Sequence, residues 1–291
     1  MMALLKALWK LRPPGEPEPR GARLVRRWRE KHLLKRLEQG WPGGFTLHRT
    51  GDLVYVPSPL DARGRQALLH PPRVHPAVLG FLRPGAVAID VGANLGEWTV
   101  PLARAVGVAG RIIAMEPVPR NAAALEATLA ANALRQAEVL RSAASDQDGT
   151  VEFVVPVVTS ARIDTGTARI GPACAGHEAL RVPRRSLDSL AAERGLDRLD
   201  LIKIDVEGHE HQVLDGAAGI LGRWRPVLVI ETGHEAQGSR AVIHDQLGGL
   251  GYRMLGILLD YGMAEAGWPA YVALDPPFRE GDAHNLLLAC E

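Results

Sequence analysis

The sequence predicts a doubly wound α/β domain, and two observations support that prediction. Short β-branched runs alternate with helix-like segments from residue 86 onward, which is typical of a parallel sheet with helices on its faces. The last two strand-like runs are closely spaced and suggest a hairpin-like, antiparallel edge. The predicted elements are strand 86–90, helix 97–106, strand 111–115, helix 118–132, strands 137–143 and 150–155, an irregular segment 157–180, strand 181–185, helix 187–194, strand 200–205, helix 209–221, strand 226–231, helix 239–249, and strands 252–258 and 285–290.

Four of the predicted strands end in an acid. These acids are Asp90, Glu116, Asp205 and Glu231. In an open parallel sheet the ligand lies beyond the carboxyl ends of the strands, so we expect the four carboxylates to gather at one edge. A row of carboxylates repels phosphates and attracts hydroxyls and cations.

Length and composition limit the classes of protein to consider. With 291 residues, 46% of them hydrophobic, the chain can hold one α/β core of roughly 200 residues and an extension. The formal net charge of +1 gives no reason to expect nucleic acid as a partner. Cys174 and Cys290 lie far apart and outside any CxxC pattern, so neither a disulfide framework nor a zinc site is indicated. No run of about 18 apolar residues is present, and we expect a cytoplasmic protein.

The N-terminal region, residues 1–44, is predicted to be a basic and partly helical extension. Its stretch 12–20 is rich in proline and reads as a linker, and residues 21–39 form a basic amphipathic helix. Two interpretations of that helix stay open: peripheral contact with a membrane or a protein, or a solvated helix packed on the main domain. Residues 45–84 are predicted to form a lead-in hairpin and helix, and the main domain begins at residue 85.

The first strand of that domain leads into the glycine-rich turn Asp90-Val91-Gly92-Ala93-Asn94-Leu95-Gly96. Glycines at 92 and 96 let the backbone pass close to a ligand or adopt a φ that a Cβ would forbid. The spacing G-x-x-x-G matches neither the dinucleotide fingerprint G-x-G-x-x-G nor a P-loop, which disfavours phosphate-bearing cofactors. An acid before such a turn suits an amine or a cation. At the next strand end, Glu116 could accept both hydroxyls of a ribose.

This combination resembles the cofactor site of class I S-adenosylmethionine methyltransferases, and further motifs are similar to the FkbM-type methyltransferase family. Those motifs are Asp205-Val206-Glu207-Gly208-His209-Glu210 after Leu201-Ile202-Lys203-Ile204, Ser186-Leu187-Asp188-Ser189-Leu190, Val229-Ile230-Glu231, Glu116-Pro117, and Ala144-Ser145-Asp146 to Gly149-Thr150. The resemblance covers about residues 80–290. It implies a Rossmann-like class I fold with a mainly parallel seven-stranded sheet and an S-adenosylmethionine-binding domain over 85–291. The segment 157–180 falls outside it, and a loop of this length is often a lid or a substrate-recognition element.

By this resemblance the protein transfers a methyl group from S-adenosylmethionine to a hydroxyl of a sugar, glycan or natural-product scaffold. The cofactor-binding residues that it implies are Asp90, Gly92, Asn94, Gly96, Glu116 and Asp146. Of these, Asp146 matches the position that contacts the adenine amino group in class I enzymes. The alternative interpretation of Asp146 is a plain turn residue.

Four residues are the candidate groups on the acceptor side: Asp205, Glu207, His209 and Glu231. The first two could bind the substrate hydroxyl or a cation, or they could serve the following helix as its cap and first turn. We interpret His209 as the general base, against the alternative of a surface histidine in the first helical turn. Further candidates are His211 as a base and His234 as a substrate contact.

The same acids leave other functions open. Together, Asp90, Asp205, Glu207 and Glu231 could gather a divalent cation such as magnesium, but a metal is not favoured because the cofactor itself accounts for them. One alternative enzyme is a nicotinamide-dependent oxidoreductase, which the G-x-x-x-G spacing disfavours. A second alternative is a non-catalytic, membrane-docked or scaffold protein that retains the fold. Intact acids at four strand ends argue against it.

Overall fold

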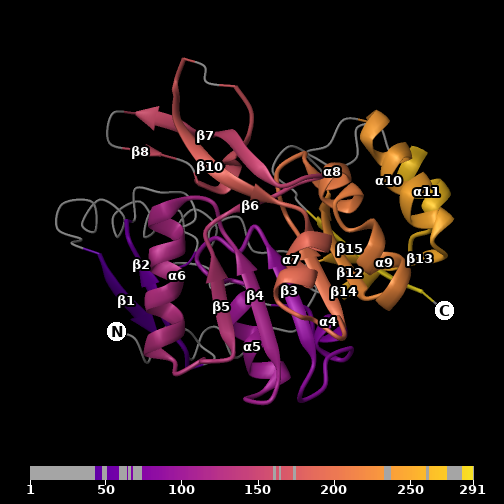
Figure 1. Ribbon diagram of the computed structural model, residues 1–291, viewed down its shortest axis with the longest axis horizontal. Helices are drawn as coiled ribbons and strands as arrows, with labels where there is room; N and C mark the ends of the chain where they lie inside the picture. The colour runs from indigo at the N-terminus through magenta and orange to yellow at the C-terminus, as the bar shows by residue number, and fades with distance from the viewer. Residues whose placement is uncertain are drawn as a thin grey trace, which may run out of the picture.

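An eight-stranded mixed sheet forms the centre of the computed structural model (Figure 1). The strands lie in the order β14-β13-β15-β12-β11-β3-β4-β5, and those from β12 to β5 are parallel to one another. Their bounds are β3 Val87–Val91, β4 Arg111–Met115, β5 Ala137–Leu140, β11 Leu201–Ile204, β12 Val227–Thr232, β13 Tyr252–Leu259, β14 Gly262–Ala264 and β15 His284–Cys290.

The structure describes residues 43–47, 51–58, 64, 67, 74–159, 162–163, 165–172, 175–232, 237–259, 262–273 and 284–290. The predicted linker 12–20 and the predicted basic helix 21–39 lie outside these ranges. None of the described helices is long and apolar enough to cross a membrane.

The predicted Rossmann-like α/β fold is confirmed, with its mainly parallel sheet and its antiparallel C-terminal edge. The sheet has eight strands rather than seven. The additional strand is β14, which folds back on β13 and pairs with it through only three residues. Three residues are too few to show the alternation by which a strand is recognised in a sequence.

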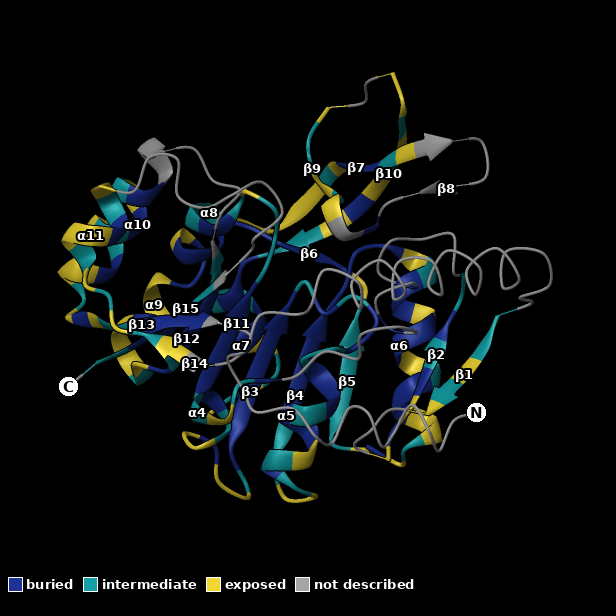
Figure 2. Ribbon diagram, turned by 180° about the vertical axis from the view of Figure 1, so that it is seen from behind, coloured by how far each residue is buried: buried dark blue, intermediate teal, exposed yellow. Residues whose placement is uncertain are grey.

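Helices cover both faces of this sheet because alternate strand residues point to opposite sides. On one face, Ala88 and Ile112 pack against α4, α5 and α6. On the other, Ile89 and Ile113 pack with α7, α8, α9 and α10, and α11 contacts α10. Figure 2 shows the central strands in the colour of buried residues along their length. The helix bounds are α4 Pro76–Leu79, α5 Thr99–Val106, α6 Pro119–Ala131, α7 Leu187–Glu193, α8 Glu210–Asp215, α9 Ala218–Trp224, α10 Gln237–Gly249 and α11 Trp268–Ala273.

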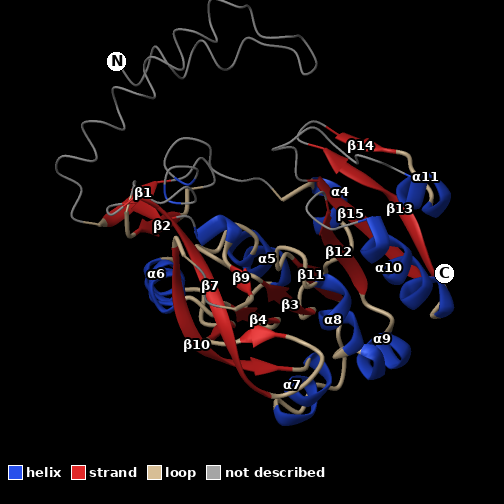
Figure 3. Ribbon diagram, turned by 90° about the horizontal axis from the view of Figure 1, so that it is seen from above, coloured by secondary structure: helices blue, strands red, loops and turns tan. Residues whose placement is uncertain are grey.

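A second, five-stranded sheet stands at the carboxyl end of the first (Figure 1). Its main part is a long antiparallel hairpin, and we call the segment 149–185 the β7–β10 arm. Seen from above, β7 and β10 lie in front of the sheet beside β4 (Figure 3). The members are β6 Ala143–Ala144, β7 Gly149–Thr159, β8 Arg162–Ile163, β9 Arg169–Ile170 and β10 His177–Arg185, with the 3-10 helix η1 Thr165–Thr167 between β8 and β9.

The arm corrects the prediction of an irregular segment over 157–180, since β7 continues to residue 159 and β10 begins at residue 177. β7 contains Pro156, and a proline cannot donate a hydrogen bond to a ladder. Its neighbour Val157 donates its N–H to the carbonyl oxygen of Gly176, the residue before β10, at 2.7 Å, so the ring of Pro156 faces the opposite side of the strand. There β9 pairs only with Phe153 and Val154 and β8 only from residue 157 onward, so no ladder bond is lost.

A small antiparallel hairpin, β1 Gly44–Leu47 with β2 Leu53–Val56, flanks the domain. Val54 and Val56 are buried against α6 and the glycine turn, and Asn132 at the end of α6 exchanges hydrogen bonds with the backbone of Leu53. The hairpin therefore packs on α6, next to the glycine turn.

Candidate active site

A pocket of about 700 Å³, including the part open to solvent, lies at the carboxyl edge of the parallel strands. The glycine turn and the end of β4 form one wall, and the segment after β11 forms the other. The β7–β10 arm covers it through Phe153, Thr165, Ala168 and Ile170. Of the ten predicted site residues, the pocket is lined by Gly92, Asn94, Glu116, Asp205, Glu207 and His209.

Both glycines of the turn have a left-handed backbone, with φ of +77° at Gly92 and +93° at Gly96. The structure gives each a further reason to be glycine, and in both cases the neighbour is protein. A Cβ at Gly92 would lie 1.9 Å from the backbone oxygen of Asp205, and a Cβ at Gly96 would lie 2.6 Å from Leu125 Cδ1. Gly96 is not part of the pocket wall, so its role is to let the turn pack on α6.

Beneath the turn, Asp90 is completely buried and does not line the pocket. Thr99 at the start of α5 donates its hydroxyl to Asp90 Oδ2 at 2.5 Å, while Oδ1 has no hydrogen-bond partner within the described ranges. Burial raises the pKa of Asp90, and the nearby Lys203 and Thr99 partly oppose that rise. Asp90 therefore lies beneath the glycine turn and does not face the pocket directly.

Glu116 is held by backbone N–H groups from both sides of the pocket wall. Asn94 N donates to Oε2 at 2.8 Å, and Val118 N donates to Oε1 at 2.9 Å. Burial raises the pKa of Glu116 to about 7, against the opposing effect of these hydrogen bonds. The Asn121 side chain also hydrogen-bonds to this carboxylate, so part of its capacity of about four acceptor sites remains for a ligand.

Asn94 joins the turn to two neighbouring elements. Its φ of +48° places it in the left-handed region that asparagine tolerates better than most residues. Its amide lies 3.5 Å from the carbonyl oxygen of Thr165 in the arm and accepts from Asn121 of α6 at 3.4 Å. The arm and the cofactor side of the pocket therefore meet at this residue.

Asp146, predicted to contact adenine, lies outside the pocket wall with its side chain 40% exposed. Ser145 donates its hydroxyl to Asp146 Oδ1 at 2.8 Å and is the main cause of a lowered Asp146 pKa, with Arg184 contributing. The buried residue that lines this end of the pocket is Ser142, whose hydroxyl lacks a hydrogen-bond partner in the described part of the chain. Sequence reasoning missed Ser142, because a lone serine after a strand has no distinguishing pattern.

On the other side, carboxylate oxygens of Asp205, Glu207 and Glu231 lie within 4.8 Å of one another. A lysine side chain, Lys203, places a positive charge next to these carboxylates. Lys203 of β11 is 1% exposed, and its Nζ lies 2.7 Å from Asp205 Oδ2. Burial alone would lower the pKa of Lys203, but the carboxylates of Asp205, Asp90 and Glu231 raise it above its ordinary value.

Sequence reasoning also missed Lys203, and here a signal was present. A single lysine interrupts the apolar run 201–204, and a buried lysine requires a paired charge. Its register partner on β3 is Asp90, which places the ammonium between the acids of both halves of the edge. The backbone of Glu207 adopts φ +55°, so the chain turns sharply just where this acid enters the pocket.

His209 lines the pocket at the start of α8 and contacts Ser145 Oγ through Nε2 at 3.0 Å. Burial, with help from His211 and Arg184, lowers its pKa to about 4, so the ring is neutral at physiological pH. Neither His211 nor Glu231 is part of the pocket wall. The remaining candidate, His234, lies outside the described residues.

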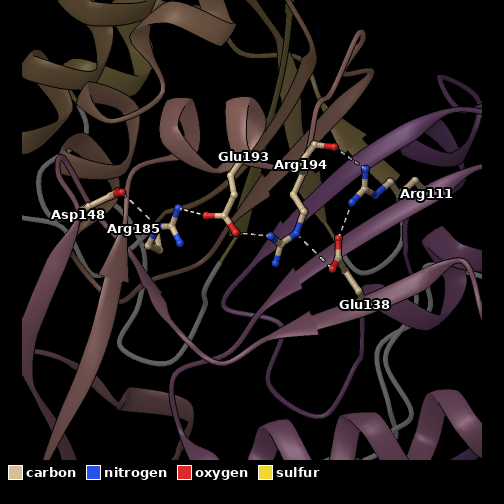
Figure 4. Close-up of polar contacts among 6 residues, drawn as sticks. All are labelled: Arg111, Glu138, Asp148, Arg185, Glu193 and Arg194. Carbon is tan, nitrogen blue, oxygen red and sulfur yellow. Dashed lines mark hydrogen bonds and ion pairs between the residues drawn. The ribbon is translucent and has the colours of Figure 1, made fainter.

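A chain of ion pairs fixes the base of the arm to the sheet. Arg185 of β10 bridges the loop before β7 and α7, and Arg194 continues the chain to β5. Single exposed ion pairs contribute little, but a connected network restricts several elements at once. The network runs through Asp148, Arg185, Glu193, Arg194, Glu138 and Arg111 (Figure 4).

Comparison with known proteins places the chain in a family. Residues 90–261 match the model of the methyltransferase FkbM domain. No curated protein matches the chain. Among solved structures, methyltransferase FkbM from Methylobacillus flagellatus KT is 21% identical with a TM-score of 0.41, over 58% of this chain and 39% of that one, so the chain spans well under half of that protein.

Two further solved structures are similar at lower identity. An S-adenosylmethionine-dependent O-methyltransferase from Thermotoga maritima is 14% identical with a TM-score of 0.42, over 88% of this chain and 80% of that one. An S-adenosylmethionine-dependent methyltransferase from Aquifex aeolicus is 15% identical with a TM-score of 0.40, over 80% and 95%. The family model spans more than half of the chain and includes every predicted site residue. The chain therefore belongs to the FkbM methyltransferase domain family.

Proposed function

We propose that this protein uses S-adenosylmethionine to methylate a hydroxyl group on a sugar, glycan or natural-product scaffold. One observation carries the proposal: a single pocket is bounded on one side by the glycine turn and Glu116 and on the other by Asp205, Glu207 and His209. A transferase needs its donor and acceptor in contact, and this pocket offers different chemistry at its two ends.

The residues present fit the cofactor. Glu116 lines the pocket and keeps acceptor capacity beyond its bonds from two backbone N–H groups and the Asn121 side chain, which suits a ribose hydroxyl. Ser142 offers a buried hydroxyl with unused hydrogen-bonding capacity, which suits the polar edge of an adenine. Met115, Phe153 and Ile170 supply the apolar wall on which an adenine ring would lie.

The charges of the pocket distinguish this cofactor from a dinucleotide. Glu116, Asp205 and Glu207 line it, and Lys203 is the cation that it contains, already bound to Asp205. A pyrophosphate would be repelled by these carboxylates, whereas a sulfonium cation would be attracted to them. This argues against the nicotinamide-dependent alternative.

When bound, S-adenosylmethionine supplies an electrophilic methyl group whose carbon–sulfur electron pair returns to sulfur as the acceptor oxygen bonds to the methyl. The protein must orient that oxygen and receive its proton. Asp205 is suited to orientation, because the contact of its Oδ2 with Lys203 Nζ at 2.7 Å fixes its position in the pocket. His209 lines the pocket and is neutral, so one of its ring nitrogens has a lone pair that can receive the proton.

Calorimetric titration with S-adenosylmethionine, S-adenosylhomocysteine and NADH tests the cofactor. We expect both sulfur nucleosides to bind and NADH not to bind, and we expect Glu116→Gln to weaken binding about tenfold or more through loss of a charged acceptor. The matched control is Glu126→Gln, which changes an exposed glutamate of α6 that pairs with Arg141. Binding of NADH alone, or equal affinity in the parent and Glu116→Gln, would contradict the proposal.

Transfer of a radiolabelled methyl group to a panel of sugars, glycans and hydroxylated natural products then identifies the acceptor. We expect label on oxygen, and the product is checked by its stability to mild acid and base. Label found only on nitrogen or sulfur acceptors would overturn the O-methyltransferase assignment and leave the cofactor assignment intact.

A further inference from the structure

A hydrogen-bonded chain leads from the pocket to the surface through Ser145. Its buried hydroxyl lies 2.8 Å from Asp146 Oδ1 on one side and 3.0 Å from His209 Nε2 on the other. Asp146 in turn lies 3.5 Å from the guanidinium of Arg184. These residues come from three places in the chain: the loop after β6, the start of α8, and β10.

The proton positions in this chain follow from its chemistry. Asp146 is ionised and can only accept, so the single hydroxyl proton of Ser145 is donated to it. The contact between Ser145 Oγ and His209 Nε2 must then be one in which the oxygen accepts, so Nε2 carries a proton. Because the ring of His209 is neutral, its other nitrogen, Nδ1, has no proton.

We propose that Asp146 and Ser145 are positioning residues that hold His209 in the Nε2-protonated form, leaving Nδ1 as the atom that accepts the proton of the acceptor hydroxyl. The inference rests on the proposed function for its chemistry but not for its geometry. As the hydroxyl O–H bond breaks, its electron pair stays on oxygen and the proton adds to the Nδ1 lone pair. The imidazolium that results keeps its Nε2–H on Ser145, where the carboxylate of Asp146 stabilises it.

The backbone around Ser145 keeps this chain in place. Ser145 N donates to Arg185 O at 3.0 Å, which ties it to β10 of the arm. Its carbonyl oxygen faces Gly216 at the end of α8, where a Cβ would lie only 2.0 Å away. Ser145 is thus clamped between the arm and the helix whose first residue follows His209, and it cannot shift without moving both.

This role for Asp146 differs from the adenine contact that the family resemblance implies. Its carboxylate is outside the pocket wall, and its Oδ1 is occupied by Ser145. A positioning residue and an adenine contact respond differently to the same substitution. Loss of an adenine contact weakens cofactor binding, whereas loss of a positioning residue changes the protonation of His209.

The test is nitrogen NMR of the full chain labelled on histidine, at neutral pH, with the His209 signals assigned by their absence in His209→Gln. In the parent we expect a neutral His209 ring protonated at Nε2. In Asp146→Asn and Ser145→Ala we expect a mixture of the two neutral forms, and in Asp146→Glu, which restores the carboxylate, the parent pattern. The matched control is Asp197→Asn, an exposed acid-to-amide change away from the pocket.

Titration of the same proteins with S-adenosylmethionine separates this inference from the proposed function. We expect Asp146→Asn to bind the cofactor within about twofold of the parent, because the substitution removes no contact in the pocket. An Nδ1-protonated ring in the parent, an unchanged ring in both variants, or a tenfold loss of cofactor affinity in Asp146→Asn would overturn the positioning role. A parent that binds no cofactor but shows the expected ring states would instead contradict the proposed function alone.

Once an acceptor is identified, the kinetic expectation is specific. Asp146→Asn should lower kcat by up to about 100-fold, the lower end of what general base catalysis contributes, and leave KM for S-adenosylmethionine unchanged. A rise in that KM with unchanged kcat would assign Asp146 to the cofactor. Asp146→Glu should recover most of kcat, which a purely structural role for the chain would not predict.

Discussion

The two halves of the pocket hold their acids by different means, although the sequence pattern at the strand ends is the same. On the β3–β4 half, Asp90 is bound by the Thr99 hydroxyl and Glu116 by two backbone N–H groups, and burial raises the pKa of both. On the β11–β12 half, Asp205 and its neighbours gather around the ammonium of Lys203. Hydrogen-bond dipoles therefore hold Glu116 and the Lys203 ammonium holds Asp205, while Asp90 interacts both with the Thr99 hydroxyl and with Lys203.

The difference matters for what each half can bind. Acids held by dipoles keep lone pairs and an adjustable proton, which suits hydroxyl groups of a cofactor. An acid paired with a buried lysine is fixed in position, which suits orientation of a polar acceptor next to a positive methyl donor. The following changes test whether the halves are as distinct as this geometry indicates.

The largest effect is expected where the halves touch, at Gly92. A Cβ there would lie 1.9 Å from the backbone oxygen of Asp205, and the φ of +77° is unfavourable for alanine. Because neither backbone can retreat without separating β3 from β11, Gly92→Ala should lose more than about 4 kcal/mol of unfolding free energy or fail to fold.

Gly195→Ala is the matched control, since its φ is +59° and a Cβ would meet nothing within 4 Å. We expect it to cost about 1–2 kcal/mol, the backbone strain alone. Urea unfolding of both proteins provides the comparison. Equal losses would show that the approach of the two halves at Gly92 is loose.

The next effect concerns the cation of the second half. Lys203→Met should destabilise the protein by about 3–5 kcal/mol, because it leaves buried carboxylates without their counter-charge. Adding Asp205→Asn to the same protein should recover part of that loss. Urea unfolding near neutral pH measures both.

The control for this change is Arg141→Met, which removes the cation of an exposed pair with Glu126 and should cost under about 1 kcal/mol. A similarly small loss for Lys203→Met would mean that water, rather than the lysine, stabilises the acids of the second half. No recovery in the double variant would mean that Asp205 is not the main partner.

The sequence was sufficient to predict the strands of both halves and the acids at their ends. It was not sufficient to predict which groups stabilise those acids. Alternating apolar runs located the parallel strands, and the acid at each strand end placed Asp90, Glu116 and Asp205 at one edge. That part is predictable because strand direction and the carboxyl-edge rule depend only on local periodicity.

The arm, the role of Lys203 and the position of Asp146 depend on three-dimensional detail. The sequence does not show on which side of the strand the ring of Pro156 lies, so it does not show that β7 continues past this residue. Spacing does not reveal that Ser145 directs Asp146 away from the pocket and connects it to His209, since those residues are 64 positions apart. Contacts of that range are set by how α8 packs, which no local pattern encodes.

A pH effect should distinguish the halves, because Glu116 has a folded-state pKa of about 7 against 4.5 for an ordinary glutamate. Between these values the folded protein holds a proton that the unfolded chain releases, so unfolding free energy falls as pH rises. The ionisation of Glu116 lowers the unfolding free energy by about 3 kcal/mol in total, and this loss is complete above pH 7. In Glu116→Gln this part of the pH dependence should vanish.

Urea unfolding of the cofactor-free protein at pH 5 and pH 8 measures that difference, with Glu126→Gln as the exposed control. We expect the parent and the control to lose the same stability between the two pH values and Glu116→Gln to lose less. An identical loss in all three would show that Glu116 is solvated enough to ionise normally, and the first half would then resemble the second.

The smallest expected effect tests whether the Thr99 hydroxyl stabilises the ionised form of Asp90 in the first half. Thr99→Val removes the 2.5 Å hydrogen bond to Asp90 and should cost about 1–3 kcal/mol. That bond lowers the Asp90 pKa, so its loss penalises the ionised form, and the cost should be larger at a pH at which Asp90 is ionised than at one at which it is protonated. Thr128→Val, which loses only a contact with the backbone N–H of Tyr55, should cost the same at both pH values. A pH-independent loss at Thr99 would mean that Lys203, rather than the Thr99 hydroxyl, stabilises the Asp90 charge.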